Sequence, residues 1–271
     1  MTSHDRSGAP TVPLAEQERL SGDSVRRVAM PMIYHYLGDK RFTYALPRAL
    51  ALQILHPGNA AGLVQHVHGG LWAHKQRSVG QMVYIAYSNR DLRSVMRSAH
   101  VHVKGKDSSG ARYHALNPEL FHFQHATYVD ALFFSIEHFH HRLSAGEKEE
   151  LYRQCCLWYG KYDISDRAVP ATYGEFQDYL EDYCARELRL SPEAAQLREQ
   201  VLNPNTWYPR KVPTAAIRAM LHPRAAELLD IAPSGRDRAS LAAFAAKAKT
   251  QAALSSAHRR LIPPARHDPD S

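Results

Sequence analysis

Apolar residues recur at helical spacing in segments of roughly ten to twenty residues, and helix start signals precede several of these segments. Asn117 followed by Pro118 supplies a cap and a proline suited to the first helical position. Ser144 and Thr172 each precede a glutamate by three residues, which is the pattern of a capping box. The main predicted helices cover about 13–20, 24–37 with a break or kink at Pro31, 44–55, 60–68, 71–87, 90–104, 117–141, 144–159, 172–187 and a segment from 191, with shorter helical patterns near 214–221, 223–231 and 238–258.

No segment shows a convincing alternation of β-branched and polar residues, and turn signals fall between segments of helical length. We therefore expect an all-α protein with a single domain of about eight to ten helices at residues 13–258. Residues 1–12 and 259–271 are polar, which predicts a disordered leader and a disordered tail.

Composition and charge narrow the class of protein. A chain of 271 residues with 44% hydrophobic and 23% charged residues suits one globular domain. The net charge of +7 would ordinarily suggest a nucleic-acid partner. However, arginine and lysine are spread along the whole chain and form no basic run interleaved with aromatic residues. We therefore expect no nucleic-acid partner, and the oligomeric state is not fixed by the sequence.

The cysteines and the N-terminal segment predict a cytoplasmic protein. The three cysteines form neither a CxxC pair nor an even set for disulfides, so reduced thiols are expected. The first residues lack the apolar core of a signal peptide. An apolar stretch does follow Arg26 and Arg27, but Pro31 and His35 interrupt it, so it is too short to span a membrane.

Seventeen histidines raise the question of a metal site. Two Glu-x-x-His pairs, Glu119 with His122 and Glu137 with His140, suggest a carboxylate-bridged di-iron centre. Both pairs fall on the same predicted helix, where a separation of eighteen residues corresponds to about 27 Å. They cannot share one metal pair, so this possibility is rejected.

His100 is the candidate for a haem ligand. The predicted helix around it carries apolar residues, including Val95 and Met96, so that its ring can enter an apolar interior. Arg97 or Lys104 could then reach a haem propionate. On spacing alone, an ordinary core histidine held by hydrogen bonds is the more common explanation of this pattern.

Several short motifs, in a fixed order, point to a known family. They are HPGNAAGLVQH (56–66), QRSV (76–79), HVHVKG (100–105), YHALNPEL (113–120) and QHATYVD (124–130). Together they resemble the haem-dependent oxygenases typified by rubber oxygenase, the latex clearing protein, a family that includes the mycophenolate-pathway oxygenase. The resemblance covers roughly residues 50–160 and is loose beyond them. It implies an all-helical protein that encloses a b-type haem, whose iron is held by the histidine of an H-x-x-V-x-G motif, here His100.

The resemblance also implies roles for charged residues. Lys104 falls where many relatives have an arginine that serves the propionates or the helix of the ligand. A basic residue and a threonine on the opposite side of the haem correspond to Arg77 and Ser78. Since arginine stays protonated, Arg77 is expected to act near bound oxygen or on a propionate rather than as an iron ligand. His74 stands where relatives often have an arginine.

Three further histidines match family positions. His56 and His66 lie in a helix pair whose small residues would admit the macrocycle or a neighbouring helix, and His66 is the candidate for a catalytic side chain there. Alternatively, His56 only satisfies carbonyls freed at the break before Pro57. His125 lies in the H-A-T segment and either supports the haem pocket or simply packs.

The function implied by the resemblance is a haem-b-dependent oxygenase. It would use O2 to oxidise or cleave an apolar, unsaturated, isoprenoid-like small molecule, such as a lipid or a secondary metabolite. A haem-binding carrier or sensor without oxygenase activity remains an alternative, as does a helical interaction protein without a cofactor. Turnover separates the first two, because only an enzyme would consume oxygen with an alkene.

Overall fold

The computed structural model describes residues 30–254, so the predicted leader, the helix at 13–20 and the predicted tail lie outside the described residues. Within that range the chain forms thirteen α-helices, one short 3-10 helix and one antiparallel hairpin. The elements are α2 (Pro31–Tyr36), α3 (Lys40–Tyr44), α4 (Leu46–Leu55), α5 (Pro57–His66), α6 (Leu71–Tyr87), α7 (Arg93–His100), β1 (Lys104–Lys106), β2 (Arg112–His114), α8 (Pro118–Phe139), α9 (Ala145–Gly160), α10 (Tyr173–Glu187), α11 (Pro192–Leu202), η1 (Pro209–Lys211), α12 (Thr214–Met220), α13 (Pro223–Leu228) and α14 (Gly235–Leu254). The predicted all-α class is confirmed. The helices are more numerous than eight to ten, because short ones such as α2, α3 and α13 occur between the long ones.

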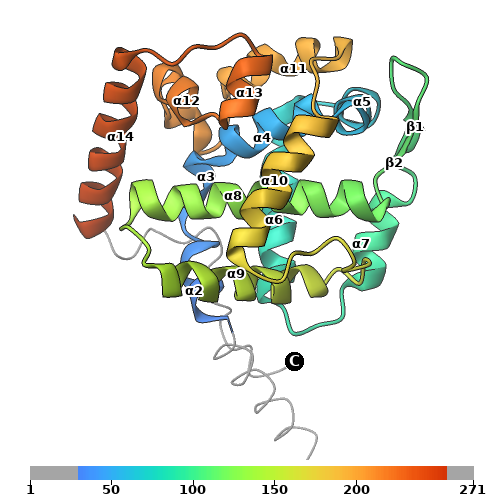
Figure 1. Cartoon of the computed structure of the whole chain (residues 1–271), viewed down its shortest axis with the longest axis horizontal. Coiled ribbons are helices and arrows are strands. Elements are labelled where there is room, and N and C mark those ends of the chain that lie inside the picture. The colour runs from blue at the N-terminus through green and yellow to red at the C-terminus, as the bar shows by residue number, and fades with distance from the viewer. Residues whose placement is uncertain (1–29, 255–271) are drawn as a thin grey trace, which may run out of the picture.

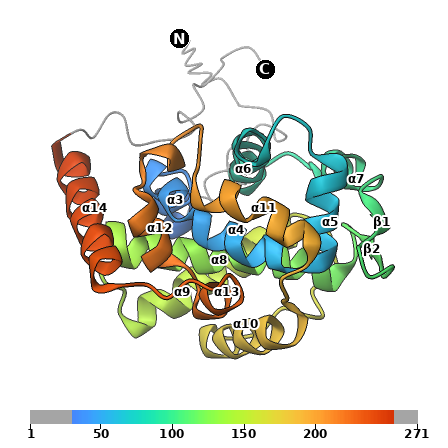
Figure 2. The same ribbon diagram turned by 90° about the horizontal axis from the view of Figure 1, so that it is seen from above.

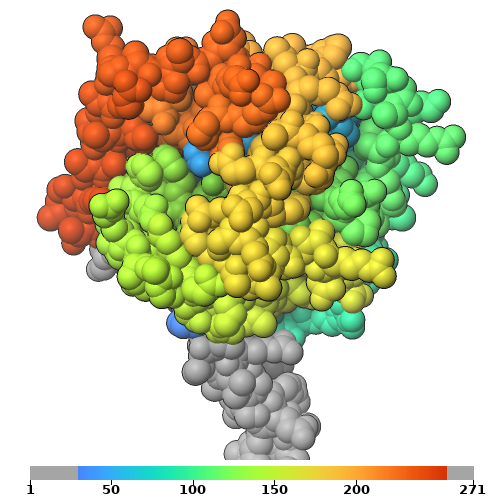
Figure 3. All heavy atoms as spheres, viewed as in Figure 1, coloured from blue at the N-terminus to red at the C-terminus, as the bar shows by residue number. Residues whose placement is uncertain are grey.

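Helices α4 and α8 form the centre of the fold (Figure 1). Every residue of α4 except Arg48 is buried, which follows from its almost wholly apolar sequence. Arg48 forms a 2.6 Å ion pair with Asp130 of α8 and donates to the carbonyl of Met220, so it ties α4 to α8 and α12. Helix α11 packs on α4, α5 and α6 from the other side (Figure 2). In Figure 3 only small blue parts of the N-terminal helices show between the C-terminal ones.

The helix starts predicted from capping residues are confirmed. The Asn117 side chain accepts from the backbone N–H groups of Glu119 and Leu120 at the start of α8. Reciprocal capping boxes begin α9 at Ser144 and α10 at Thr172. These signals predict the starts well because each satisfies backbone donors that the first helical turn leaves unpaired.

Two prolines lie in the first turn of a helix. The position predicted for a break or kink, Pro31, begins α2, where its missing N–H costs no hydrogen bond, and the residues before Met30 lie outside the described range. The break predicted at His56 and Pro57 is confirmed: His56 caps α5, which starts at Pro57 rather than near Ala60.

The segment after His100 corrects the prediction of one helix over 90–104. Helix α7 ends at His100, and Lys104 lies in β1, where it pairs with His114 of β2. The β-branched Val101 and Val103 favour extended backbone at this point. Gly105 allows the close pairing, since a Cβ there would lie 2.9 Å from the Tyr113 hydroxyl. The strands are three residues long, too short to give a visible alternation in the sequence.

The hairpin packs against α5 through the small residues of the HPGNAAGLVQH motif. A Cβ added to Gly58 would lie 2.9 Å from Tyr113 Cβ, and one on Gly62 would lie 3.5 Å from the Tyr113 ring. At these two positions, therefore, the close neighbour of the glycines is a tyrosine of the hairpin.

No helix within residues 30–254 is long and apolar enough to cross a membrane.

Replacing Gly58 by alanine is expected to destabilise the fold by about 1–3 kcal/mol, because the new methyl group meets the backbone-anchored Cβ of Tyr113. The matched control is Gly80→Ala in α6, where no atom lies within 4 Å and alanine should stabilise the helix by up to about 1 kcal/mol. Urea unfolding of both variants provides the comparison. Equal stabilisation by the two substitutions would contradict the packing described.

Candidate active site

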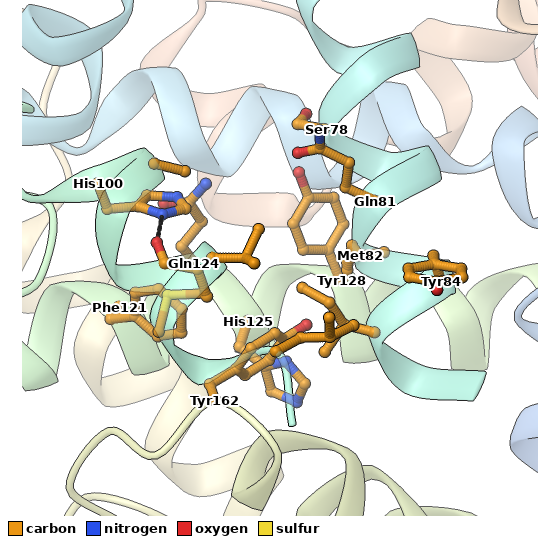
Figure 4. Close-up of a pocket in the computed structure, with 15 residues that line it drawn as sticks. Ser78, Gln81, Met82, Tyr84, His100, Phe121, Gln124, His125, Tyr128 and Tyr162 are labelled. Atoms are coloured by element: carbon orange, nitrogen blue, oxygen red, sulfur yellow. Dashed lines mark hydrogen bonds between the residues drawn. The ribbon is translucent and has the colours of Figure 1, made fainter. Parts of the chain in front are cut away.

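Two adjoining cavities lie among α5, α6, α7, β2 and the first half of α8. The first, here called the tyrosine cavity, has a volume of about 320 Å³. Its walls are mostly apolar, with hydroxyl and amide groups at one end (Figure 4). Its lining residues are Ser78, Gln81, Met82, Tyr84 and Ile85 of α6, Leu92, Val95, Met96, Ala99 and His100 of or beside α7, Phe121, Gln124, His125 and Tyr128 of α8, and Tyr162.

The second, here called the histidine cavity, has a volume of about 190 Å³. Its polar lining residues are Gln53, Asn59, His66, His74, Lys75, His100, His102, Tyr113 and Gln124. Ala99, His100 and Gln124 line both cavities, so these three residues form the boundary between the two spaces.

His100 is held in one orientation by its own helix. Met96 is buried and His100 half-buried, while most of α7 is exposed. The His100 Nδ1 atom lies 2.8 Å from the carbonyl oxygen of Met96, which can only accept, so Nδ1 carries the proton and donates. In this tautomer Nε2 has the lone pair that an axial ligand requires. Phe121 packs against the ring with a centroid distance of 5.9 Å.

Lys75 is a site residue that the sequence reasoning missed. Its side chain is 1% exposed, and its Nζ donates to Gln53 Oε1 at 2.7 Å and to the Tyr128 hydroxyl at 3.3 Å. Gln53 in turn donates to the Thr127 hydroxyl at 2.7 Å. A signal was present, because Lys75 occupies a buried position in the periodic pattern of α6, between Trp72 and Val79.

The Lys75 network reaches both cavities. Lys75 lines the histidine cavity, and Tyr128 lines the tyrosine cavity. In Figure 4 the Tyr128 hydroxyl points towards the side chains of Ser78 and Gln81. The Ser78 hydroxyl donates weakly to the Lys75 carbonyl at 3.4 Å. One end of the tyrosine cavity therefore contains hydrogen-bonding groups in otherwise apolar surroundings.

His66 and His74 both line the histidine cavity. The Nε2 atom of His66 is buried without a hydrogen-bond partner. Burial lowers the pKa of His74 to about 4, and the neighbouring cations Lys75 and Arg77 add to the effect. Both rings are available to a ligand as hydrogen-bonding groups.

His56 and His125 have different surroundings. His56 lines neither cavity: its Nδ1 accepts from the Asn59 N–H at 3.4 Å and its ring contacts Phe123 and Tyr183, which fits the alternative of a structural role. His125 is buried, lines the tyrosine cavity and packs on Trp158 with a centroid distance of 4.3 Å. Burial lowers the pKa of His125 to about 3, so this ring is neutral at physiological pH.

Besides His56, the three predicted cationic residues also lie outside both cavities. Arg77 is exposed on α6. Arg97 is 56% exposed and points to Asp163, whose carboxylate lies 3.9 Å away. Lys104 is exposed on β1, which corrects the expectation that it lies one helical turn below His100. The structure therefore brings His66, His74, Ser78, His100 and His125 together and leaves the three cations at the surface.

The described residues contain no group of three or more histidine, cysteine, aspartate or glutamate side chains placed to hold a metal ion. Cys155, Cys156 and Cys184 are free thiols. A haem iron needs only one histidine from the protein, and His100 could supply it.

Comparison with known protein families places the chain in one of them. The family model described as "ER-bound oxygenase mpaB/B'/Rubber oxygenase, catalytic domain" matches residues 34–250. The match confirms the resemblance predicted from the motifs and extends it well past residue 160. No curated protein and no solved structure matches the chain significantly.

Proposed function

The chain belongs to the catalytic-domain family of the mpaB and rubber oxygenases and is an oxygenase-type enzyme, and we propose that it uses haem b with His100 as the axial ligand. The observation that carries the proposal is the hydrogen bond between His100 Nδ1 and the Met96 carbonyl, which leaves Nε2 free where the two cavities meet. The fit is supported by the chemistry of the site, because one neutral imidazole in apolar surroundings is what a b-type haem needs.

Residues around His100 would hold the cofactor. Met96, Phe121 and Leu92 supply apolar contacts for a macrocycle, and the cavity boundary at Ala99 and Gln124 gives it access to both spaces. When bound, haem b supplies the redox-active iron that oxidation by O2 requires.

The chain's own side chains would then control the oxidation. Lys75 donates to the Tyr128 hydroxyl and so fixes its orientation, which leaves the Tyr128 proton free to donate to a polar atom in the tyrosine cavity. The apolar walls exclude water, and this strengthens every hydrogen bond made inside. Ser78 and Gln81 supply the other hydroxyl and amide at the same end.

The substrate is proposed to be an apolar, unsaturated small molecule of isoprenoid type. The mouth of the tyrosine cavity carries apolar residues that are unusually exposed: Tyr84 is 46% and Val95 59% exposed. Leu92 and Ile85 continue this apolar rim inwards. Exposed apolar groups around an opening are typical of a binding site for an apolar ligand.

A haem-binding carrier or sensor is the second candidate, favoured by the position of Arg77. The basic residue expected near bound oxygen is exposed and lines neither cavity. If no other donor replaces it, haem would bind without oxidising a substrate.

Two measurements on the full chain test the proposal. Protein produced with a supply of haem is expected to show a Soret band and to consume O2 with squalene but not with squalane, its saturated counterpart, since only the alkene can be cleaved. Protein that stays colourless after haem addition would refute haem binding. A Soret band without alkene-dependent oxygen uptake over a broad panel of alkenes would favour the carrier or sensor.

A further inference from the structure

The polar lining of the histidine cavity contains bases and amides but no acid. Among its lining residues are His66, His74, His102 and Lys75, and none is an aspartate or a glutamate. The tyrosine cavity next to it has neither lysine nor arginine in its walls. The only basic side chain that they share is His100. One compartment therefore contains a buried ammonium group together with imidazole and amide groups, and the other is mainly apolar.

Several donors in the histidine cavity have unused hydrogen-bonding capacity. Asn59 Nδ2 and His66 Nε2 are buried and have no hydrogen-bond partner, and the His66 nitrogen is a donor in the tautomer that carries its proton there. Lys75 carries three N–H groups and uses two of them, on Gln53 and Tyr128, and no ion pair with an acid is formed by this buried side chain within the described residues. Buried donors left without a partner are costly, so such a group indicates a missing acceptor.

A metal ion does not explain this cluster. No set of three or more potential ligands among residues 30–254 is close enough to hold one, although four histidines line the cavity. The ammonium group of Lys75 would in addition repel a cation. An acceptor that completes the cavity fits a space of about 190 Å³, and the buried ammonium of Lys75 favours one with a negative charge.

We propose that the histidine cavity is a carboxylate-binding subsite, in which Lys75, His66 and Asn59 hold the acidic end of a ligand whose apolar body lies in the tyrosine cavity. A carboxylate offers about four acceptor positions, which matches a cluster of converging donors. The apolar body passes His100, because this residue lines both spaces. The carboxylate subsite does not depend on the proposed function. Only the identification of the apolar body as a haem or as a substrate of the enzyme rests on that function.

The same carboxylate chemistry has two possible sources, a propionate of haem b and the acid group of a substrate. Two matched pairs of probes distinguish them on the full chain. Haem b is compared with its dimethyl ester, and decanoate is compared with decan-1-ol. In one pair or in both, the acid is expected to bind at least about tenfold more tightly than its neutral counterpart. This ratio corresponds to one charge-assisted hydrogen bond. The fatty-acid pair needs no haem, so failure of the subsite is distinguishable from failure of haem binding.

Variants connect the preference to the cavity. Lys75→Met removes the buried ammonium and should reduce the acid preference to nearly one. His66→Leu removes a donor that lacks a partner, so it should fold and still lose part of the preference. Lys106→Met is the matched control, because this lysine is exposed on β1 and lines neither cavity.

Calorimetric titration gives the affinities. A preference in the haem pair assigns the subsite to the propionates, and one in the fatty-acid pair assigns it to the substrate. The proposal is overturned if neither pair shows a preference, if both cavity variants retain it in full, or if Lys106→Met loses as much as Lys75→Met.

Discussion

Haem content is expected to fall to background when His100 is replaced by glycine. Haem affinity should decrease by more than about 100-fold, because even residues that only support a metal ligand typically change metal affinity by about 10–100-fold. The deletion leaves a space beside the Met96 carbonyl that previously held the imidazole ring. Added imidazole should occupy this space, donate the same hydrogen bond to the Met96 carbonyl and restore haem binding. Haem content of purified protein, with and without imidazole, is the measurement.

The control for this experiment is His68→Gly, at an exposed histidine near the end of α5 that lines neither cavity. Its haem content should be unchanged. Unchanged haem content in His100→Gly would mean that another residue binds the iron, and loss without rescue by imidazole would indicate a general loss of structure.

Acid is expected to destabilise the fold through its buried neutral histidines, and His125 is one whose contribution can be measured by itself. Its pKa of about 3 in the folded protein compares with 6.5 for an ordinary histidine. Below pH 6.5 the unfolded chain therefore binds a proton that folded His125 does not, so stability is full above pH 6.5 and falls as the pH drops towards 3. By pH 5 the loss from His125 alone is about 2 kcal/mol.

Urea unfolding at pH 7 and pH 5 measures this dependence. The decrease in the free energy of unfolding between the two values should be smaller by about 2 kcal/mol in His125→Phe than in the unmodified protein. His68→Phe, at an exposed histidine, should leave the decrease unchanged. An identical pH dependence in His125→Phe and the unmodified protein would show that His125 is not neutral in the fold.

The long helices were predictable because their signals are local. Asn117, Ser144 and Thr172 satisfy unpaired donors within their own first turn, so neighbouring residues alone determine these starts. The hairpin was not predictable in this way. Its two strands depend on Tyr113 packing against Gly58 of α5, a contact between residues far apart in the sequence.

The candidate site was predicted in part, and the difference between Arg77 and Lys75 shows why. Successive residues of an α-helix are about 100° apart, so these two side chains, two residues apart, point to nearly opposite sides of α6. Lys75 is on the buried face of α6. It comes three residues before Ser78, so the two side chains lie on nearly the same side of the helix. Alignment with short motifs identified a basic residue near Ser78, but only the helical periodicity distinguishes the lysine that faces the cavities from the arginine that faces solvent.

The central claim is that His100 binds the haem iron through Nε2, and the resonance Raman spectrum of the ferrous, haem-loaded protein tests it most directly. We expect an iron–histidine stretching band in the unmodified protein, its absence in His100→Gly, and its return at a shifted frequency when imidazole is added to that variant. An unshifted band in His100→Gly without imidazole would contradict the claim.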